Sequence, residues 1–183
     1  MSKRTRTRET LFTAALELFD ERGYEATTVA EIARRAGVTE MTFFRHFPSK
    51  DAVLVDDPYD PLIADAIVAA DPALPALAAV TAGVRDAWAS VPPPAAAAVR
   101  ERLRIVAGSP ALRGALARNS RATEQAIAEA LRCRGVASRP AVVVAAAAVA
   151  ALNGALLDWA AVEGDESLGD AILGALAALD GAS

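Results

Sequence analysis

The side chains best suited to chemistry gather in one short stretch, residues 39–47, which reads TEMTFFRHF. Hydroxyl, cationic, imidazole and aromatic groups surround two phenylalanines there, Phe43 and Phe47, which are four positions apart. Residues four apart lie on the same side of a helix, so we expect these two rings to pack inward and the other groups to face outward. A short helix with hydroxyl, cationic and aromatic groups on its outer side suits contacts to phosphates and base edges.

Two helices and a tight turn should position this stretch. Thr28 and Glu31 have the spacing of a capping box, which predicts that a helix begins there. Gly37 should end that helix, because glycine tolerates the left-handed conformation of a C-terminal cap. Thr39 is a suitable N-cap for the next helix, and Pro48 should end it. Two helices joined by a glycine-containing turn of about three or four residues form a helix-turn-helix, whose second helix enters the DNA major groove.

The segment from residue 27 to residue 50 resembles the DNA-binding segment of the TetR family of bacterial transcriptional regulators. The matching residues are Thr27-Thr28, Ile32-Ala33, Ala36-Gly37-Val38, the run from Thr42 to Phe47, and Ser49-Lys50. The resemblance implies DNA contacts by Thr27, Thr28, Thr39, Met41, Thr42, Phe44, Arg45, His46 and Lys50. Position 44 usually carries tyrosine in that family and position 41 is often small. Phe44 and Met41 therefore leave the operator sequence open, but not the DNA-binding role.

Within this set we expect different groups to supply affinity and specificity. Lys50 follows Pro48-Ser49 at the start of another helix, where its ammonium and free backbone N–H groups would hold a phosphate. His46 and the basic segment 2–8 (SKRTRTR) would also contact the DNA backbone. The alternatives are a capping or surface role for His46 and a solvated tail for residues 2–8. Base edges would be contacted by Thr39, Met41, Thr42 and Arg45.

Composition favours an all-helical chain. Of the 183 residues, 54% are hydrophobic, which excludes a largely disordered chain, and only 5% are aromatic. Alanine is abundant and favours helix. The net charge of −4 is unevenly distributed: residues 1–50 carry nine basic and seven acidic residues, or +2, and residues 51–183 carry ten basic and sixteen acidic residues, or −6. The segment with the motif is therefore the basic end of an acidic chain.

The expected architecture is an all-α fold of about nine helices with two domains. A helix over residues 7–22 would complete a three-helix head with the two helices of the motif. The run from Asp56 to Pro61 should break or bend the chain, which predicts a hinge. We therefore expect a helix-turn-helix DNA-binding domain over residues 4–60 and a helical ligand-binding and dimerisation domain over residues 61–183.

An uncharged run of seventeen residues, 141–157, approaches the ~18 that indicate a membrane-spanning helix. Alanine is a weak membrane former, Asn153 and Gly154 interrupt the run, and no basic cluster flanks it. We therefore expect a helix packed within the body and against a second copy of the chain, without membrane insertion.

The resemblance also implies a homodimer and a small-molecule pocket. The last two long helices, about residues 140–163 and 167–180, would join two copies, so the dimer contact would run over about residues 140–180. Candidate pocket residues are Trp88, Trp159 and Asn153, because aromatic faces and one amide in an apolar body suit a small apolar effector. The alternatives are core packing for the two tryptophans and pairing across the dimer for Asn153.

These expectations favour a cytoplasmic, ligand-responsive regulator that binds double-stranded DNA, most simply a repressor released from a palindromic operator by the effector. Whether it represses or activates depends on where the operator lies. One alternative is a small-molecule-binding scaffold protein without sequence-specific DNA recognition, and another is an enzyme. The sequence has no nucleophile elbow, phosphate-binding glycine loop or metal cluster, so we expect no catalytic residue, metal or cofactor. The single cysteine, Cys133, excludes an internal disulfide framework.

Overall fold

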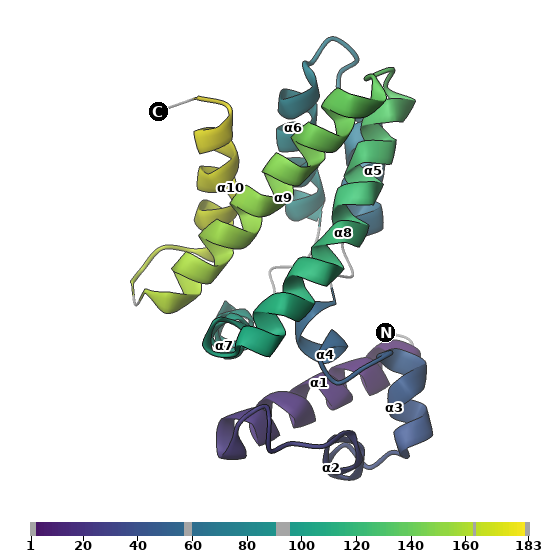
Figure 1. Cartoon of the computed structure of the whole chain (residues 1–183), viewed down its shortest axis with the longest axis vertical. Coiled ribbons are helices and arrows are strands. Elements are labelled where there is room, and N and C mark those ends of the chain that lie inside the picture. Colours follow the sequence, from purple (N-terminus) through teal and green to yellow (C-terminus); the bar gives the residue numbers. More distant parts are fainter. Residues whose placement is uncertain (1–2, 57–59, 91–95, 163, 182–183) are drawn as a thin grey trace. The chain divides into compact units, whose positions relative to one another are not determined.

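The computed structural model describes residues 3–56, 60–90, 96–162 and 164–181. These residues form ten helices and no strand, which confirms the predicted all-α fold (Figure 1). The chain divides into two compact units. The first contains Met1–Asp56 together with Glu101–Leu116, and the second contains Asp57–Arg100 together with Ala117–Ser183.

The first unit begins with four helices: α1 (Lys3–Arg22), α2 (Val29–Arg35), α3 (Glu40–His46) and α4 (Ala52–Val55). Helix α1 packs against α2 and α4, and α2 packs against α3. Their apolar sides meet in a core whose fully buried large side chains include Leu11, Leu18, Ile32, Phe43, Phe47 and Leu54. Burial of a side chain of this size contributes about 1.5–3 kcal/mol, so this core is what holds three short helices in place.

Local capping explains why α2 and α3 begin and end where they do. The Thr28 hydroxyl accepts from the backbone N–H of Glu31, whose carboxylate accepts from the N–H of Thr28, so both halves of the predicted capping box are present. The Thr39 hydroxyl accepts from the N–H of Thr42 at the start of α3. Gly37, at φ 70°, has the left-handed backbone that ends α2. The predicted helix-turn-helix is confirmed.

The N-terminal segment differs from expectation. The sequence predicts that the first helix begins near residue 7, and this start is wrong because α1 already begins at Lys3. No helix breaker lies between Lys3 and Arg8, and lysine and arginine are good helix formers. The Thr7 and Thr10 hydroxyls each donate to the carbonyl oxygen four residues earlier, at 3.0 and 2.9 Å. The basic residues of this segment therefore stand on a helix.

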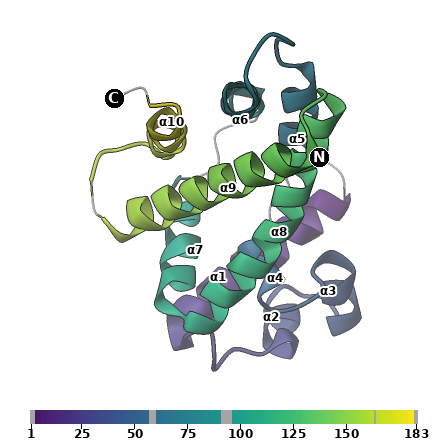
Figure 2. The same cartoon turned by 45° about the horizontal axis from the view of Figure 1, so that its top comes forward.

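The second unit contains α5 (Asp60–Ala69), α6 (Ala76–Ser90), α9 (Ser138–Ala161) and α10 (Leu168–Leu179). Helix α7 (Ala96–Gly108) and helix α8 (Pro110–Cys133) each run from one unit into the other. Within the second unit α5 packs against α6, α9 packs against α10, and α6 contacts both α9 and α10 (Figures 1 and 2). Its buried core includes Ile67, Val80, Ile127, Leu131 and Leu176.

Two predictions about chain organisation concern the segment between the units. Helix α4 ends at Val55 and α5 begins at Asp60. The hinge predicted over residues 56–61 falls mainly on residues 57–59, which lie outside the described residues. The first unit also includes residues 101–116, which a division of the sequence at residue 60 would leave out.

Helix α9 is the one helix in the described part of the chain that is long and apolar enough to cross a membrane by length and composition. One side of it is buried, including Ala141, Ala145, Ala148 and Trp159. Only 22% of its most apolar window is buried within one copy of the chain, and the remaining residues of the window are half-buried or exposed.

Candidate nucleic-acid interface

Helix α3 presents the two sides that its sequence predicts. Phe43 and Phe47 are 0% and 1% exposed, whereas Met41 is 69% exposed and Phe44 is 52% exposed. The buried rings of Phe43 and Phe47 lie 5.7 Å apart between centroids, and Phe44 meets Phe43 edge-on at 5.4 Å. The buried rings therefore set the orientation of the helix, and large apolar groups remain on its outer side for a partner to cover.

Polar groups complete this outer side. The hydroxyls of Thr39 and Thr42 lie 3.0 Å apart, close enough for one to donate to the other. The Arg45 guanidinium is exposed and lies along the helix beside Met41, with Nη2 3.9 Å from Sδ. Hydroxyls and a guanidinium next to apolar side chains match the mixture of donors, acceptors and thymine methyl groups in the major groove.

His46, the last residue of α3, is half-buried. Burial lowers the pKa of its imidazole below the ordinary value, and the positive charges of Arg4 and Arg8 lower that pKa further. The imidazole is therefore uncharged at neutral pH in the free protein. A phosphate beside it would favour the protonated form and raise its pKa.

Lys50 is held inside the first unit. Its Nζ donates to the carbonyl oxygens of Tyr24 and Thr27 at 2.8 and 2.9 Å, and it lies 4.0 Å from the centroid of the Tyr24 ring. An ammonium group has three donors, so these bonds leave one N–H for another acceptor. Lys50 therefore anchors the turn between α1 and α2, whatever else it contacts.

The hydroxyls of the two threonines at the start of α2 already form hydrogen bonds within the protein. Thr27 is 1% exposed, and its hydroxyl lies 2.9 Å from the Gly23 carbonyl oxygen and 3.2 Å from that of Leu18. Its side chain is therefore buried in this conformation, whereas the resemblance implies a DNA contact there. Thr28 is exposed, but its hydroxyl belongs to the capping box.

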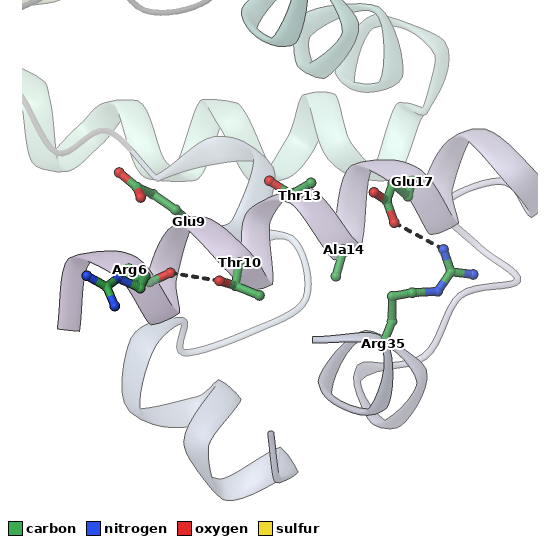
Figure 3. A pocket seen from close by; sticks show the side chains of 7 residues that line it. All are labelled: Arg6, Glu9, Thr10, Thr13, Ala14, Glu17 and Arg35. Carbon is green, nitrogen blue, oxygen red and sulfur yellow. Dashed lines mark hydrogen bonds and ion pairs between the residues drawn. The ribbon is translucent and has the colours of Figure 1, made fainter. Parts of the chain in front are cut away.

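Ion pairs neutralise two other arginines of this unit. Arg35 pairs with Glu21 at 2.8 Å and with Glu17 at 3.1 Å, and Arg22 pairs with Glu31 at 2.6 Å. The hydrogen bond from Arg35 lowers the pKa of Glu21. The Arg35–Glu17 pair closes one end of an open hollow along α1, whose other lining residues are Arg6, Glu9, Thr10, Thr13 and Ala14 (Figure 3). Because its charges are mixed, this hollow is a poor site for an anion.

The candidate pocket residues of the second unit all pack within it. Trp159 is 4% exposed, its indole N–H donates to the Glu166 carbonyl oxygen at 2.8 Å, and the Arg100 guanidinium lies 4.1 Å from its ring centroid. The Asn153 amide donates to the Ser120 hydroxyl at 2.8 Å and so joins α9 to α8. Trp88 is half-buried beside the start of α10.

Two surface hollows are lined by residues of the first unit. One is the hollow of Figure 3, and the other lies between the end of α1 and the turn from α7 to α8, lined by Phe19, Arg22, Gly23, Tyr24, Glu25, Ala26, Ile105, Gly108 and Ser109. Neither is lined by Trp88, Asn153 or Trp159. Their assignment to a ligand pocket stays a prediction.

Two known protein families match this chain, one in its N-terminal part and one in its C-terminal part. Residues 11–56 match the family described as "Bacterial regulatory proteins, tetR family", and residues 74–182 match the "MftR C-terminal domain". The chain belongs to the TetR family. The family consists of bacterial regulatory proteins, and the outward-facing α3 suits a DNA-binding role.

Curated relatives share a short part of this TetR-family chain. The HTH-type transcriptional regulator TcmR of Streptomyces glaucescens is 55% identical over 51 residues, which are 28% of this chain and 23% of TcmR. The A-factor receptor protein of Streptomyces griseus is 41% identical over 56 residues, which are 29% of this chain and 20% of that protein. The match thus spans about a quarter of these relatives or less.

Solved structures match the TetR-family fold over nearly the whole chain. NalD, the secondary repressor of the MexAB-OprM multidrug efflux pump in Pseudomonas aeruginosa, is 25% identical with a TM-score of 0.55, over 97% of this chain and 96% of NalD. SmeT, the repressor of the Stenotrophomonas maltophilia efflux pump SmeDEF, is 22% identical with a TM-score of 0.54, over 96% of this chain and 89% of SmeT.

One contact at the interface has no signal in the sequence. Arg8 reaches the end of α3, where its guanidinium donates to the His46 carbonyl oxygen at 2.8 Å. These residues are 38 positions apart, and no local pattern of periodicity or capping relates them. The sequence placed Arg8 only within a basic segment.

Proposed function

We propose that this TetR-family regulator is a ligand-responsive repressor that binds a palindromic operator as a homodimer and releases it when a small apolar effector binds the body. The observation that carries the proposal is the exposed outer side of α3. Its apolar groups, Met41 and Phe44, are exposed although the same helix buries two phenylalanines completely. DNA in the major groove would cover them.

Specificity in this proposal comes from contacts between α3 and base edges. Thr39 and Thr42 offer hydroxyls to donors or acceptors, and Arg45 offers the guanidinium that pairs with guanine. Met41 and Phe44 supply apolar surface for a thymine methyl group or the sugar-phosphate backbone. The Thr39 and Thr42 hydroxyls also cap α3, so the groups that would read the bases are held at fixed positions.

Affinity would come from phosphate contacts around α3. His46 and the remaining N–H of Lys50 lie at or beyond the C-terminal end of α3, and Lys50 is held in place by two carbonyl oxygens. Lys3, Arg4 and Arg6 are exposed on the first turns of α1. Each phosphate contact releases counterions, so this part of the binding energy weakens as the salt concentration rises.

Dimerisation would use the uncovered sides of α9 and α10. Small apolar residues are exposed along α9, at Val143, Ala147, Ala150 and Gly154. On α10, Gly174 and Ala178 are exposed and one turn apart. Small side chains let two helices approach closely, and a second copy of the chain would bury this surface. This supports the predicted contact over about residues 140–180, and a two-fold dimer would match two half-sites of a palindrome.

The effector would bind the second unit and favour one of its conformations. Such a ligand shifts the equilibrium only if it binds the DNA-releasing conformation more tightly than the DNA-bound one. Trp88, Trp159 and Asn153 remain the candidate contacts, although the polar groups of Trp159 and Asn153 already bond within the chain. An apolar molecule that uses their surfaces without competing for those bonds is therefore the favoured class.

A footprint on the DNA upstream of the protein's own gene tests the proposal. We expect protection of two related half-sites, lost when an effector is added. No protection at any protein concentration would favour the scaffold alternative. Thermal melts with a panel of apolar molecules would identify the effector class, because a ligand that binds only the folded state raises the melting temperature.

Replacing Lys50 with alanine tests the phosphate contacts. We expect weaker binding to every DNA sequence by a similar factor, and a slope of log affinity against log salt that falls by about one unit. Thr42→Ala is the matched control, because it should change the preference among operators and leave the salt slope unchanged. If Lys50→Ala left both affinity and slope unchanged while the protein stayed folded, Lys50 would contact no phosphate.

A further inference from the structure

Arg8 makes three contacts near the C-terminal end of α3. Its Nη1 donates to the His46 carbonyl oxygen at 2.8 Å, and its Nη2 pairs with the Asp56 carboxylate at 3.1 Å. Its guanidinium carbon lies 4.2 Å from the centroid of the Phe47 ring. One side chain of α1 thus holds the last carbonyl of α3, the buried ring that follows it and a carboxylate beyond α4.

Helix α3 needs such an anchor. It has only seven residues, and helices this short are not stable without tertiary contacts. The last carbonyls of a helix have no partner within it, and Phe47 continues in an extended conformation that ends the hydrogen-bond ladder. The Arg8 guanidinium supplies a donor there. Its planar fork can bond a carbonyl oxygen and a carboxylate at once, which a lysine ammonium does less well.

Asp56, the carboxylate that Arg8 binds, lies where the chain leaves the N-terminal segment of the first unit. It caps the C-terminal end of α4, and it is the last residue of the first unit before the chain continues at residue 57. Its carboxylate is bound to the same guanidinium that holds the end of α3. Arg8 therefore provides a direct link between Asp56 and the end of α3.

We infer that Arg8 is a positioning residue for operator reading, which fixes the C-terminal end of α3 and couples its orientation to Asp56. This differs from the role that its place in the basic N-terminal segment suggests, which is a phosphate contact. The inference rests on the proposed function, because its main readout is discrimination between operator and random DNA. Loss of a phosphate contact would weaken both kinds of binding alike, whereas loss of α3 positioning weakens operator binding selectively.

The first experiment compares Arg8→Ala with Arg6→Ala on operator and random DNA over a range of salt concentrations. Arg6 is the matched control, because it is an exposed arginine two positions earlier and so lies on another side of the same helix. For Arg8→Ala we expect the ratio of operator to random affinity to fall about tenfold, with an unchanged salt slope. For Arg6→Ala we expect an unchanged ratio. A slope lower by about one unit and an unchanged ratio for Arg8→Ala would overturn the inference.

Two further variants separate charge from geometry and test the coupling. Arg8→Lys keeps the positive charge but lacks the planar guanidinium that bonds two acceptors at once. We expect it to lower the operator-to-random affinity ratio almost as much as Arg8→Ala does. A wild-type ratio in Arg8→Lys would contradict the positioning role. Asp56→Ala should lower the operator-to-random ratio on its own, and adding it to Arg8→Ala should change little more. Fully additive effects would show that the two residues act independently.

A measurement without DNA tests the Arg8 anchor independently of the proposed function. Hydrogen exchange at the amides of residues 43–47 should be faster in Arg8→Ala than in the wild type or Arg6→Ala, because the end of α3 loses its anchor. Unchanged exchange there would overturn the inference even if the protein binds an operator. Faster exchange in a protein whose wild type shows no operator preference would refute the proposed function and leave the anchor standing.

Discussion

At the scale of single residues, chemically identical side chains have different roles here. The Thr27 hydroxyl is buried against backbone carbonyls, the Thr28 hydroxyl belongs to the capping box, and the Thr39 hydroxyl caps the reading helix on its outer side. Thr28 and Thr39 are both exposed capping residues, one at the start of α2 and one at the start of α3, whereas Thr27 is buried. Arg8 and Arg45 differ in the same way, since one guanidinium bonds within the protein and the other is exposed.

The pKa of His46 leads to a prediction about pH. The pKa is lowered in the free protein by burial and by Arg4 and Arg8, and a bound phosphate raises it, so DNA binding takes up a proton. Affinity should therefore increase as the pH falls between the pKa of the bound form and that of the free form. Below the free-form pKa the imidazole is charged in both states, and the gain stops.

Anisotropy titrations of operator binding between about pH 5 and pH 8 would measure this dependence. His46→Gln should remove the part of it that arises from this residue, because glutamine does not titrate. If the variant and the wild type showed the same pH dependence, His46 would not approach a phosphate.

At the scale of elements, the distance between helices depends on small side chains. Gly83 of α6 faces α5 so closely that an added Cβ would lie 2.7 Å from the backbone nitrogen of Ile67. Backbone atoms cannot move aside as a flexible side chain can, so the two helices would have to separate. The same argument does not hold for Gly108 at the end of α7, where nothing lies within 4 Å of an added Cβ.

Gly83→Ala should therefore destabilise the protein, although alanine is the better helix former. We expect a loss of about 1–3 kcal/mol in the free energy of unfolding, as for other overpacked cores. Gly108→Ala is the control, and it should change stability by less than about 0.5 kcal/mol or increase it. Urea unfolding of both variants would show the difference, and equal stability of the two would mean that α5 and α6 can separate without cost.

At the scale of the whole molecule, the proposed dimer leads to a prediction about the exposed apolar residues of α9. Val143 is 60% exposed on this helix, whereas Val68 is 48% exposed on α5, outside the predicted dimer contact. Both are exposed valines of the second unit, so a charge placed at either costs little within one copy of the chain. Only at position 143 should it oppose association.

Val143→Glu should therefore weaken the dimer, since two carboxylates would be buried near a two-fold axis, and it should also reduce operator affinity. Val68→Glu should leave both properties unchanged. Sedimentation velocity and operator titrations of the two variants would test this. A Val143→Glu protein that stays dimeric would place the dimer contact elsewhere.

The sequence by itself determined the local features, namely helix caps, the glycine turn and the buried side of α3, which depend on residues a few positions apart. The capping box of Thr28, the glycine turn at Gly37, the N-cap at Thr39 and the inward side of Phe43 and Phe47 are all local, because helix caps and helical periodicity join residues three or four positions apart. These features predicted the helix-turn-helix and the outward face of α3, and with them the DNA-binding role.

Tertiary structure alone decided which polar side chains bond to partners far away in the sequence. Lys50 bonds to carbonyls 23 and 26 positions away, Asn153 bonds to a hydroxyl 33 positions away, and Arg8 bonds to a carbonyl and a carboxylate 38 and 48 positions away. A long charged or amide side chain finds such partners only after the helices have packed, and no local pattern records them. The physical reason is that capping acts along the chain, whereas these bonds act across the core that the packed helices create.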